Sequence, residues 1–111
     1  MPTGKEIVEG LLSELRRGTL VLSVLSQLDK PQYGYSLVQL LSEKGVPIEA
    51  NTLYPLLRRL EGQELLKSMW ETDGAKPRKY YVLTEKGSDV FTQLREEWTK
   101  TVQGITALME E

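Results

Sequence analysis

The sequence predicts a mainly α-helical fold that contains one small β-hairpin. Over most of the chain, apolar residues recur every three or four positions, the spacing that lines one face of a helix. Residues 65–83 depart from it, because two runs of strand-like composition flank residues 72–77, a segment dense in turn formers. The hairpin follows a predicted helix at residues 51–62. A helix followed by a hairpin is the DNA-reading end of a winged helix-turn-helix, so we expect that architecture, with an additional N-terminal helix and a long C-terminal helix.

The recognition helix at residues 51–62 is predicted to bury one face and expose the other. Its inward face consists of Leu53, Leu56, Leu57 and Leu60. Its outward face carries Thr52, Tyr54, Pro55, Arg58 and Arg59. Asn51 suits the N-cap, because its side-chain oxygen can accept a hydrogen bond from an amide of the first turn. With that cap, the missing amide of Pro55 removes only the first intrahelical hydrogen bond.

The hairpin is predicted to carry basic residues at its turn and on its second strand, where it would meet DNA phosphates. These residues are Lys76, Arg78 and Lys79. Tyr80 and Tyr81 alternate across the second strand, so one of the two is expected in the core. Trp70, at the base of the hairpin, is also expected to pack in the core.

Two helices are predicted before the helix-turn-helix. The first begins at Thr3, which can form a capping box with Glu6, and ends near Arg17. Its apolar stripe consists of Ile7, Val8, Leu11, Leu12 and Leu15. The second runs from Thr19 to Leu28 and is apolar over most of its circumference, so we expect it at the centre of the core.

A third helix is predicted to open at residues 33–36 and to end at Gly45. Ser36 and Gln39 can form its capping box. Residues 46–48 then form an extended link, with a minimal strand against the hairpin as the alternative. Because this link is short, the third helix and the recognition helix form a helix-turn-helix pair.

The last predicted helix begins at Thr84, a suitable N-cap, and continues for roughly 25 residues, or about 37 Å. Its apolar positions follow the spacing of a coiled-coil seam: Phe91, Leu94, Trp98, Val102, Ile105 and Leu108. A helix of this length overhangs a small domain, so we expect it to pair with the same helix of a second copy, with or without that copy's first helix. The expected homodimer contacts are Leu94, Trp98, Ile105 and Leu108. Residues 1–87 would then bind DNA and residues 88–111 would dimerise, within one compact domain.

Composition excludes several classes of function. The 111 residues include no cysteine and no histidine, which removes disulfides, thiolate metal sites and the commonest general base. The sequence has no glycine-rich phosphate loop, and we expect neither an enzyme nor a bound metal or cofactor. No apolar run approaches the ~18 residues of a membrane span, and the first residues lack a secretion-type apolar region, so we expect a cytoplasmic protein.

The net charge of −2 is unevenly distributed. Residues 1–43 carry −1, residues 44–86 carry +2 and residues 87–111 carry −3. The positive segment contains the recognition helix and the hairpin, which is where DNA phosphates would lie. Because the excess is small, we expect salt-sensitive binding with few phosphate contacts per subunit.

Four segments together resemble the PadR-like family of winged-helix transcriptional regulators. They are RRGTL at 16–20, YGYSL at 33–37, TLYPLLRRLE at 52–61 and PRKYYVLTEKG at 77–87. The resemblance extends over residues 16–87 and includes the proline of the recognition helix. It implies a repressor of the compact branch, which has a single C-terminal helix and is often released by a small molecule. It also implies a slightly earlier start for the third helix.

The predicted DNA contacts lie on the recognition helix, the hairpin and the start of the third helix. They are Tyr35, Asn51, Thr52, Tyr54, Pro55, Arg58, Arg59, Lys76, Arg78 and Lys79. Residues in the first turns of a recognition helix normally reach base edges. Arg58 can read guanine or hold phosphate, and both roles stay open. The alternative function is a winged helix used only for protein interaction or dimerisation, without specific DNA binding.

Trp98 lies in LREEWTKTV, residues 94–102, which is similar to the last helix of multidrug-sensing PadR-like proteins. In those proteins a tryptophan at this place faces its dimer mate, and planar aromatic compounds stack between the two. The resemblance implies an effector site at Phe91, Trp98 and Val102 for a planar aromatic small molecule. The face of an indole also attracts cations, which favours planar cations. A dimer-interface anchor is the alternative role of Trp98.

Overall fold

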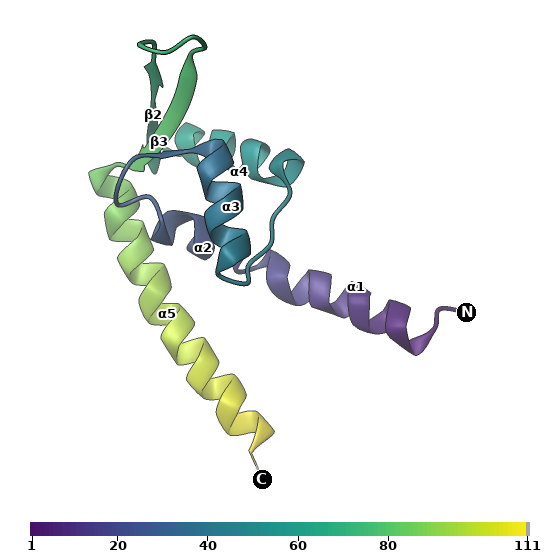
Figure 1. The fold of residues 1–111 in the computed structure, drawn as a ribbon. Helices are drawn as coiled ribbons and strands as arrows, with labels where there is room; N and C mark the ends of the chain where they lie inside the picture. The colour runs from purple at the N-terminus through teal and green to yellow at the C-terminus, as the bar shows by residue number, and fades with distance from the viewer. Residues whose placement is uncertain (111) are drawn as a thin grey trace.

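The computed structural model describes residues 1–110. The elements in chain order are α1 (Gly4–Arg17), α2 (Leu20–Ser26), β1 (Gln32–Tyr33), α3 (Gly34–Glu43), α4 (Ala50–Gly62), β2 (Leu66–Glu71), β3 (Arg78–Leu83) and α5 (Glu85–Met109). The winged helix-turn-helix body lies between two outer helices, α1 and α5, which extend from it in different directions (Figure 1). The predicted fold class is confirmed. Within residues 1–110, no helix is both long and apolar enough to span a membrane.

Helix α2 lies at the centre of the core, as predicted. Its Val24 and Leu25 are completely buried, as is Leu28 just after it. The amide of Leu83, at the end of β3, donates to the carbonyl of Leu28 at 2.8 Å and ties the sheet to this segment. The predicted inward face of α4 is buried throughout: Leu53, Leu56, Leu57 and Leu60. This burial decides which face of α4 is turned to solvent.

The sheet has three antiparallel strands in the order β1-β3-β2. The predicted second strand of the hairpin matches β3, and Tyr81 is its core residue whereas Tyr80 is half-buried. The alternative of a strand at 46–48 is wrong, because β1 occupies that edge of β3. The amide of Val46 instead donates to the carbonyl of Leu41 at 2.8 Å, which closes the end of α3.

Helix α4 begins earlier than predicted. Its N-cap is Glu49, whose carbonyl accepts from the amide of Leu53 at 2.9 Å. The prediction of Asn51 as the N-cap is therefore wrong, and Asn51 lies inside the first turn. Ala50 is a strong helix former and allows this earlier start. Pro55 becomes the sixth helical residue, so it has no amide to donate to the carbonyl of Asn51 four residues earlier.

Helix α3 also begins earlier, as the family resemblance implies. Tyr33 is held extended by its pairing with β3 and serves as the N-cap, so the helix begins at Gly34. Ser36 already lies in the first turn, and the predicted capping box of Ser36 and Gln39 is wrong.

The two outer helices have the predicted caps. Thr3 Oγ1 accepts from the amide of Glu6 at 3.1 Å, and Thr84 Oγ1 accepts from the amide of Gly87 at 2.9 Å. The apolar stripe of α1 is exposed along its whole length, because α1 buries none of its residues. The two helices therefore start as predicted. The stripe of α1 is uncovered, whereas α5 packs Val90 and Phe91 against the core and leaves its apolar residues from Leu94 onward exposed within residues 1–110.

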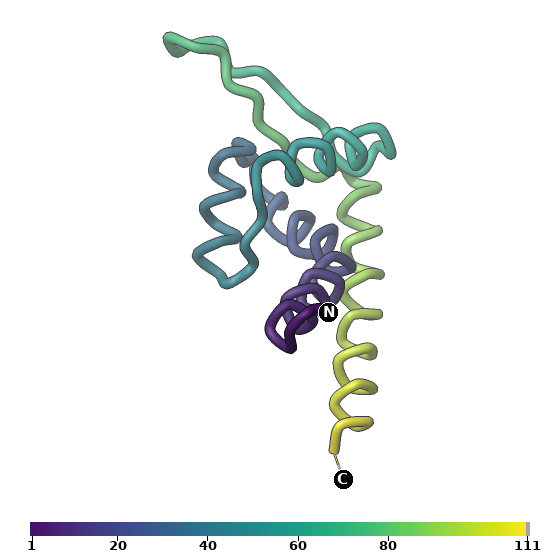
Figure 2. The backbone as a smooth tube through the Cα atoms, turned by 90° about the vertical axis from the view of Figure 1, so that its right-hand side faces the viewer, coloured from purple at the N-terminus to yellow at the C-terminus, as the bar shows by residue number. Residues whose placement is uncertain are grey.

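Trp70 is 62% exposed, so its predicted place in the core is wrong. It pairs with Lys79 across the hairpin and shares a sheet face with Leu66 and Tyr81, which are buried. The hairpin extends past the body (Figure 2), so Trp70 lies beyond the edge of the core. The Lys79 ammonium lies 5.8 Å from the centre of the indole ring.

Candidate nucleic-acid interface

The outward face of α4 exposes every residue of this helix that was predicted to contact DNA. These residues are Asn51, Thr52, Tyr54, Pro55, Arg58 and Arg59. The exposure follows from the pattern of the helix, because the four leucines between them pack into the body. The capping role falls to Glu49, so the side-chain amide of Asn51 is not engaged as a cap.

A groove of about 400 Å³ lies between the start of α3, α4 and β3. Its lining consists of Tyr33, Gly34, Tyr35, Ser36, Tyr54, Arg78 and Lys79. The fold thus brings together predicted DNA contacts from three separate segments. Gly34 allows α3 to approach α4 this closely, because a β-carbon at Gly34 would lie 2.5 Å from Cε1 of Tyr54. Gly34 was missed as a site residue, and its only sequence signal is its place between two tyrosines.

Tyr33 connects this groove to the hairpin. Its hydroxyl donates a hydrogen bond to the Glu71 carboxylate, which raises the pKa of Tyr33 above its ordinary value. Its ring lies edge-on to that of Tyr80, with 5.8 Å between the centroids. The guanidinium of Arg78 lies 5.5 Å from the centre of the Tyr33 ring. Tyr33 therefore contacts both strands of the hairpin and holds Arg78 at the groove. This role depends on the pairing of β1 with β3, which sequence patterns do not reveal.

Lys79 lies on the other face of β3 from Arg78. Its ammonium is 3.7 Å from Oε1 of Glu61, near the end of α4, and 5.5 Å from the centre of the Tyr81 ring. Glu61 also accepts a hydrogen bond from the hydroxyl of Ser68. Among the predicted hairpin contacts, Lys79 therefore already has its charge paired, with Glu61 of α4.

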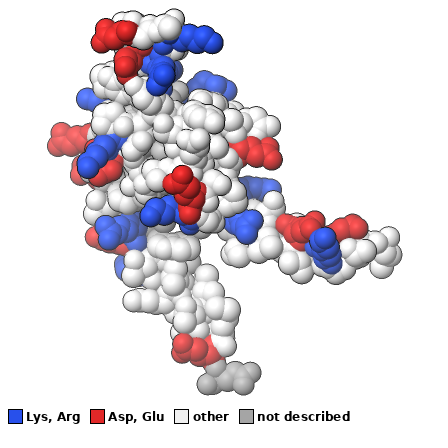
Figure 3. All heavy atoms as spheres, in the orientation of Figure 1, with Lys and Arg blue, Asp and Glu red and all other residues white. Residues whose placement is uncertain are grey.

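The other predicted basic contacts are unpaired. Within residues 1–110, no ion pair involves Arg58, Arg59, Lys76 or Arg78. Figure 3 shows basic groups on the hairpin beside acidic ones, so the positive surface there is small. A small surface of this kind agrees with the expectation of few phosphate contacts per subunit.

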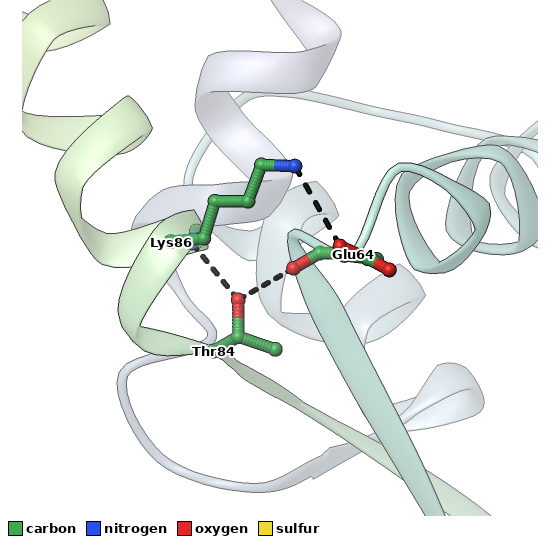
Figure 4. Close-up of polar contacts among 4 residues, drawn as sticks. Glu64, Thr84 and Lys86 are labelled. Atoms are coloured by element: carbon green, nitrogen blue, oxygen red, sulfur yellow. Dashed lines mark hydrogen bonds and ion pairs between the residues drawn. The ribbon is translucent and has the colours of Figure 1, made fainter.

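The start of α5 is fastened to the turn between α4 and β2 (Figure 4). Thr84 Oγ1 donates to the carbonyl of Glu64 at 2.7 Å, and the Lys86 ammonium lies 3.8 Å from the Glu64 carboxylate. Gly87 packs directly on Leu65, because a β-carbon at Gly87 would lie 2.0 Å from the Leu65 carbonyl oxygen. Close backbone packing thus connects the long outer helix to the recognition helix and the hairpin.

The model of the transcriptional regulator PadR-like family matches residues 21–93. This match extends from α2 into α5 and includes the recognition helix and the hairpin. The chain belongs to the PadR-like family. The family is one of transcriptional regulators, which agrees with the prediction that the chain is not an enzyme.

Individual relatives support the same assignment. The crystal structure of a PadR family transcriptional regulator from Eggerthella lenta is 53% identical, covers 96% of this chain and 95% of that chain, and has a TM-score of 0.90. A transcriptional regulator of Mycobacterium tuberculosis is 33% identical over 97 residues, which cover 84% of this chain and 91% of that protein. Bacillus subtilis PadR in complex with operator DNA is 21% identical, with a TM-score of 0.64 over 68% of this chain and 46% of that chain. At this identity, the likeness to Bacillus subtilis PadR concerns the fold.

The predicted effector residues of this PadR-like regulator lie on α5, and two of the three come together. Phe91 and Trp98 line a hollow of about 420 Å³ between α2 and α5. The remaining lining residues are Thr19, Leu22, Ser23, Ser26, Val46 and Arg95. Val102 lies one turn beyond Trp98, outside this lining, and is 39% exposed. Arg95 was missed, and it places a positive charge in a hollow that was expected to suit planar cations.

The predicted dimer contacts form an exposed apolar row along α5. The row consists of Leu94, Trp98, Ile105 and Leu108, with exposed fractions between 38% and 86%. Exposure increases toward the C-terminal end of the helix, which extends away from the body (Figure 1).

Proposed function

We propose that this PadR-like regulator is a repressor that binds a two-fold symmetric operator as a homodimer. The observation that carries the proposal is the exposed polar face of α4 next to a hairpin with free cations. An α-helix fits the major groove of DNA, and a hairpin beside it can lie along the adjacent backbone. Bacillus subtilis PadR, which shares the fold, has been crystallised with operator DNA.

The residues of the interface take two roles in this proposal. Asn51, Thr52, Tyr54 and Pro55 lie in the first turns of α4 and reach base edges, while Arg58 contacts either a base or phosphate. The phosphate contacts are Tyr35, Arg59, Lys76, Arg78 and Lys79. Lys79 contributes least, because Glu61 already neutralises its charge.

The homodimer forms through residues 88–111 in this proposal. A row of large apolar side chains along an overhanging helix marks an interaction surface, because another surface that covers it removes apolar area from water. The same row on a second copy has matching length and spacing, and the exposed stripe of α1 adds further apolar area. Residues 1–87 then form the DNA-binding part of each subunit.

The hollow at Trp98 supplies the control of DNA binding. A planar aromatic molecule can stack on the indole of Trp98 against Phe91, and the dimer would bring the two Trp98 side chains to the same seam. Arg95 favours a neutral or anionic aromatic molecule over a cationic one, in contrast to the expectation for the indole face alone. Such a ligand releases DNA only if it binds more tightly to a dimer whose recognition helices have a different spacing.

DNA binding is tested with duplexes selected from a random library by the purified protein. We expect selected sites with two-fold symmetry and half-sites about one helical turn apart, bound by a dimer in sedimentation. A dimer that enriches no sequence and shifts no duplex would instead support a protein-interaction module.

Effector binding is tested on the Trp70→Phe variant, so that Trp98 is the only remaining indole. Fluorescence is titrated without DNA, using the cationic dye ethidium and the anionic dye anilinonaphthalene sulfonate. We expect saturable quenching, stronger with the anionic dye, that disappears in Trp70→Phe combined with Trp98→Ala. Absence of quenching by either dye would leave Trp98 as a packing residue.

A further inference from the structure

A second basic surface lies at the other edge of the recognition helix, where α1 ends. Arg17 lines two adjoining hollows there, of about 310 Å³ and about 350 Å³. Arg16, Glu49 and Thr52 also line the first of them. Thr52, Pro55 and Arg59 also line the second. The last turn of α1 and the outward face of α4 thus form one continuous surface, which we call the α1–α4 flank and define by Arg16, Arg17, Thr52, Pro55 and Arg59.

The α1–α4 flank combines charges with an apolar floor. Leu20 lines both hollows, and Val21 and Leu56 line the second. Arg16, Arg17 and Arg59 are exposed, and none of them takes part in an ion pair within residues 1–110. The single carboxylate among the lining residues is that of Glu49. Apolar atoms beside unpaired guanidinium groups suit a sugar-phosphate chain, because the sugar can pack on the floor while the phosphate meets the cations.

The position of the flank on α4 distinguishes it from the groove described above. Tyr54 packs against Gly34 and faces the hairpin side of α4. Thr52, Pro55 and Arg59 recur at helical spacing and face the end of α1 instead. Arg16 and Arg17 also complement the negative end of the α1 dipole, but a dipole role does not explain why Arg17 lines the same hollow as Arg59. Figure 3 shows basic groups where α1 joins the body.

We propose that Arg17, together with Arg59, is a phosphate contact on the DNA strand opposite to the one held by the hairpin. A helix in the major groove has a sugar-phosphate strand on each side, so the hairpin and the α1–α4 flank would hold one strand each. This inference rests on the proposed DNA binding. It assigns α1 a role in DNA contact as well as in the dimer, since Arg17 in its last turn lines a hollow with residues of α4, while the rest of α1 extends away.

The first test compares Arg17→Gln with Lys5→Gln, which removes the same charge from the far end of the same helix. Binding to a selected duplex is measured by fluorescence anisotropy over a range of salt concentrations. Arg17→Gln should flatten the slope of log affinity against log salt by about 0.9 per subunit and lower affinity roughly eightfold per subunit at 0.1 M salt. Lys5→Gln should leave both unchanged, and both variants should remain folded and dimeric.

A second measurement separates contact from folding effects. The chain has no cysteine, so Arg17→Cys carries a single thiol to which an iron chelate can be attached. The chelate at position 17 should cut the strand that flanks the half-site on the side away from the hairpin, and the same chelate on Lys5→Cys should not. Equal salt slopes for Arg17→Gln and Lys5→Gln, or no cleavage from position 17, would overturn the inference while DNA binding stands. A wild-type protein that binds no duplex would overturn the proposed function and this contact with it.

Discussion

The body and the two outer helices differ in how they cover their apolar residues. In the body, Leu53, Leu57 and Leu60 of the recognition helix are at most 1% exposed. In α1 no residue is buried, and in α5 the one buried residue is Gly87. The body therefore has a core of its own, whereas α1 and the part of α5 from Leu94 onward carry apolar side chains that this chain leaves exposed. The surface proposed to bind DNA is thus built by one chain, whereas the proposed homodimer would need the exposed stripes of two.

The largest expected effect comes from breaking the seam of α5. Leu94→Asp combined with Ile105→Asp places two carboxylates in the proposed dimer interface, and each costs several kcal/mol unless it is neutralised. Sedimentation should show a folded monomer, and binding to a symmetric duplex should be lost. Gln93→Asp combined with Gln103→Asp adds the same charges beside the seam and should stay dimeric. A dimer that survives the first pair would place the interface elsewhere.

The next largest effect distinguishes apolar residues buried in the body from apolar residues exposed on α5. Leu57→Ala leaves a cavity in the body and should lower the free energy of unfolding by ~2–5 kcal/mol at every protein concentration. Leu108 is 86% exposed in the single chain, so Leu108→Ala should act only through the dimer. Urea unfolding at low and high protein concentration measures both. If Leu108→Ala lowered the free energy of unfolding equally at low and high protein concentration, Leu108 would be stabilising the single chain and not the dimer.

Gly87 marks the boundary between the two regions. Gly87→Ala places a methyl group against the Leu65 carbonyl and should destabilise the protein by ~1–3 kcal/mol. Gly104 lies in the same helix, and a β-carbon at Gly104 would have no atom within 4 Å, so Gly104→Ala should instead stabilise by up to ~1 kcal/mol. Thermal unfolding of both variants provides the comparison. If Gly87→Ala were also stabilising, α5 would not be packed on the α4–β2 turn.

The smallest effect concerns the contact between Tyr33 and the hairpin. Tyr33→Phe removes the hydrogen bond to Glu71, which is made by the protonated phenol and raises its pKa. The stabilisation should therefore be fully present below pH ~10, the ordinary tyrosine pKa, and should disappear as the pH rises through the raised pKa of Tyr33. Urea unfolding of the wild type and Tyr33→Phe at pH 8 and pH 11 checks this. Tyr35→Phe, at an exposed phenol, should show no such difference. A wild-type advantage over Tyr33→Phe that is undiminished at pH 11 compared with pH 8 would exclude the protonated phenol as its source.

Local periodicity was enough to predict much of this fold. The spacing of leucines in the recognition helix gave its buried face, and the cap residues Thr3 and Thr84 marked the starts of α1 and α5. The composition of residues 78–83 predicted β3 with its observed bounds. These features depend on residues that are close in the sequence.

Apart from the starts of α3 and α4, which were placed one or two residues too late, the errors concern contacts between distant segments. Trp70 is a large apolar residue of the kind found in cores. It is exposed because the hairpin extends past the body. The pairing of Lys79 with Glu61 and the edge strand at Tyr33 likewise depend on how β2, β3 and α3 are placed in space. The sequence therefore predicted which residues of α4 are exposed, but not the contacts made where several elements meet.

DNA contact by α4 is tested most directly by the binding of Arg58→Ala to a selected duplex, compared with Lys44→Ala, which removes an exposed charge at the end of α3. Arg58 lies on the exposed face of α4 and has no ion-pair partner within residues 1–110. Anisotropy titrations against the selected site and single-base variants of it measure affinity, discrimination and salt slope together. We expect Arg58→Ala to lose ~1–3 kcal/mol with relaxed discrimination at one base pair if Arg58 reads a base, or to lose affinity uniformly with a flatter salt slope if it holds phosphate. Binding by Arg58→Ala that equals that of Lys44→Ala in all three measures would contradict the placement of α4 against DNA.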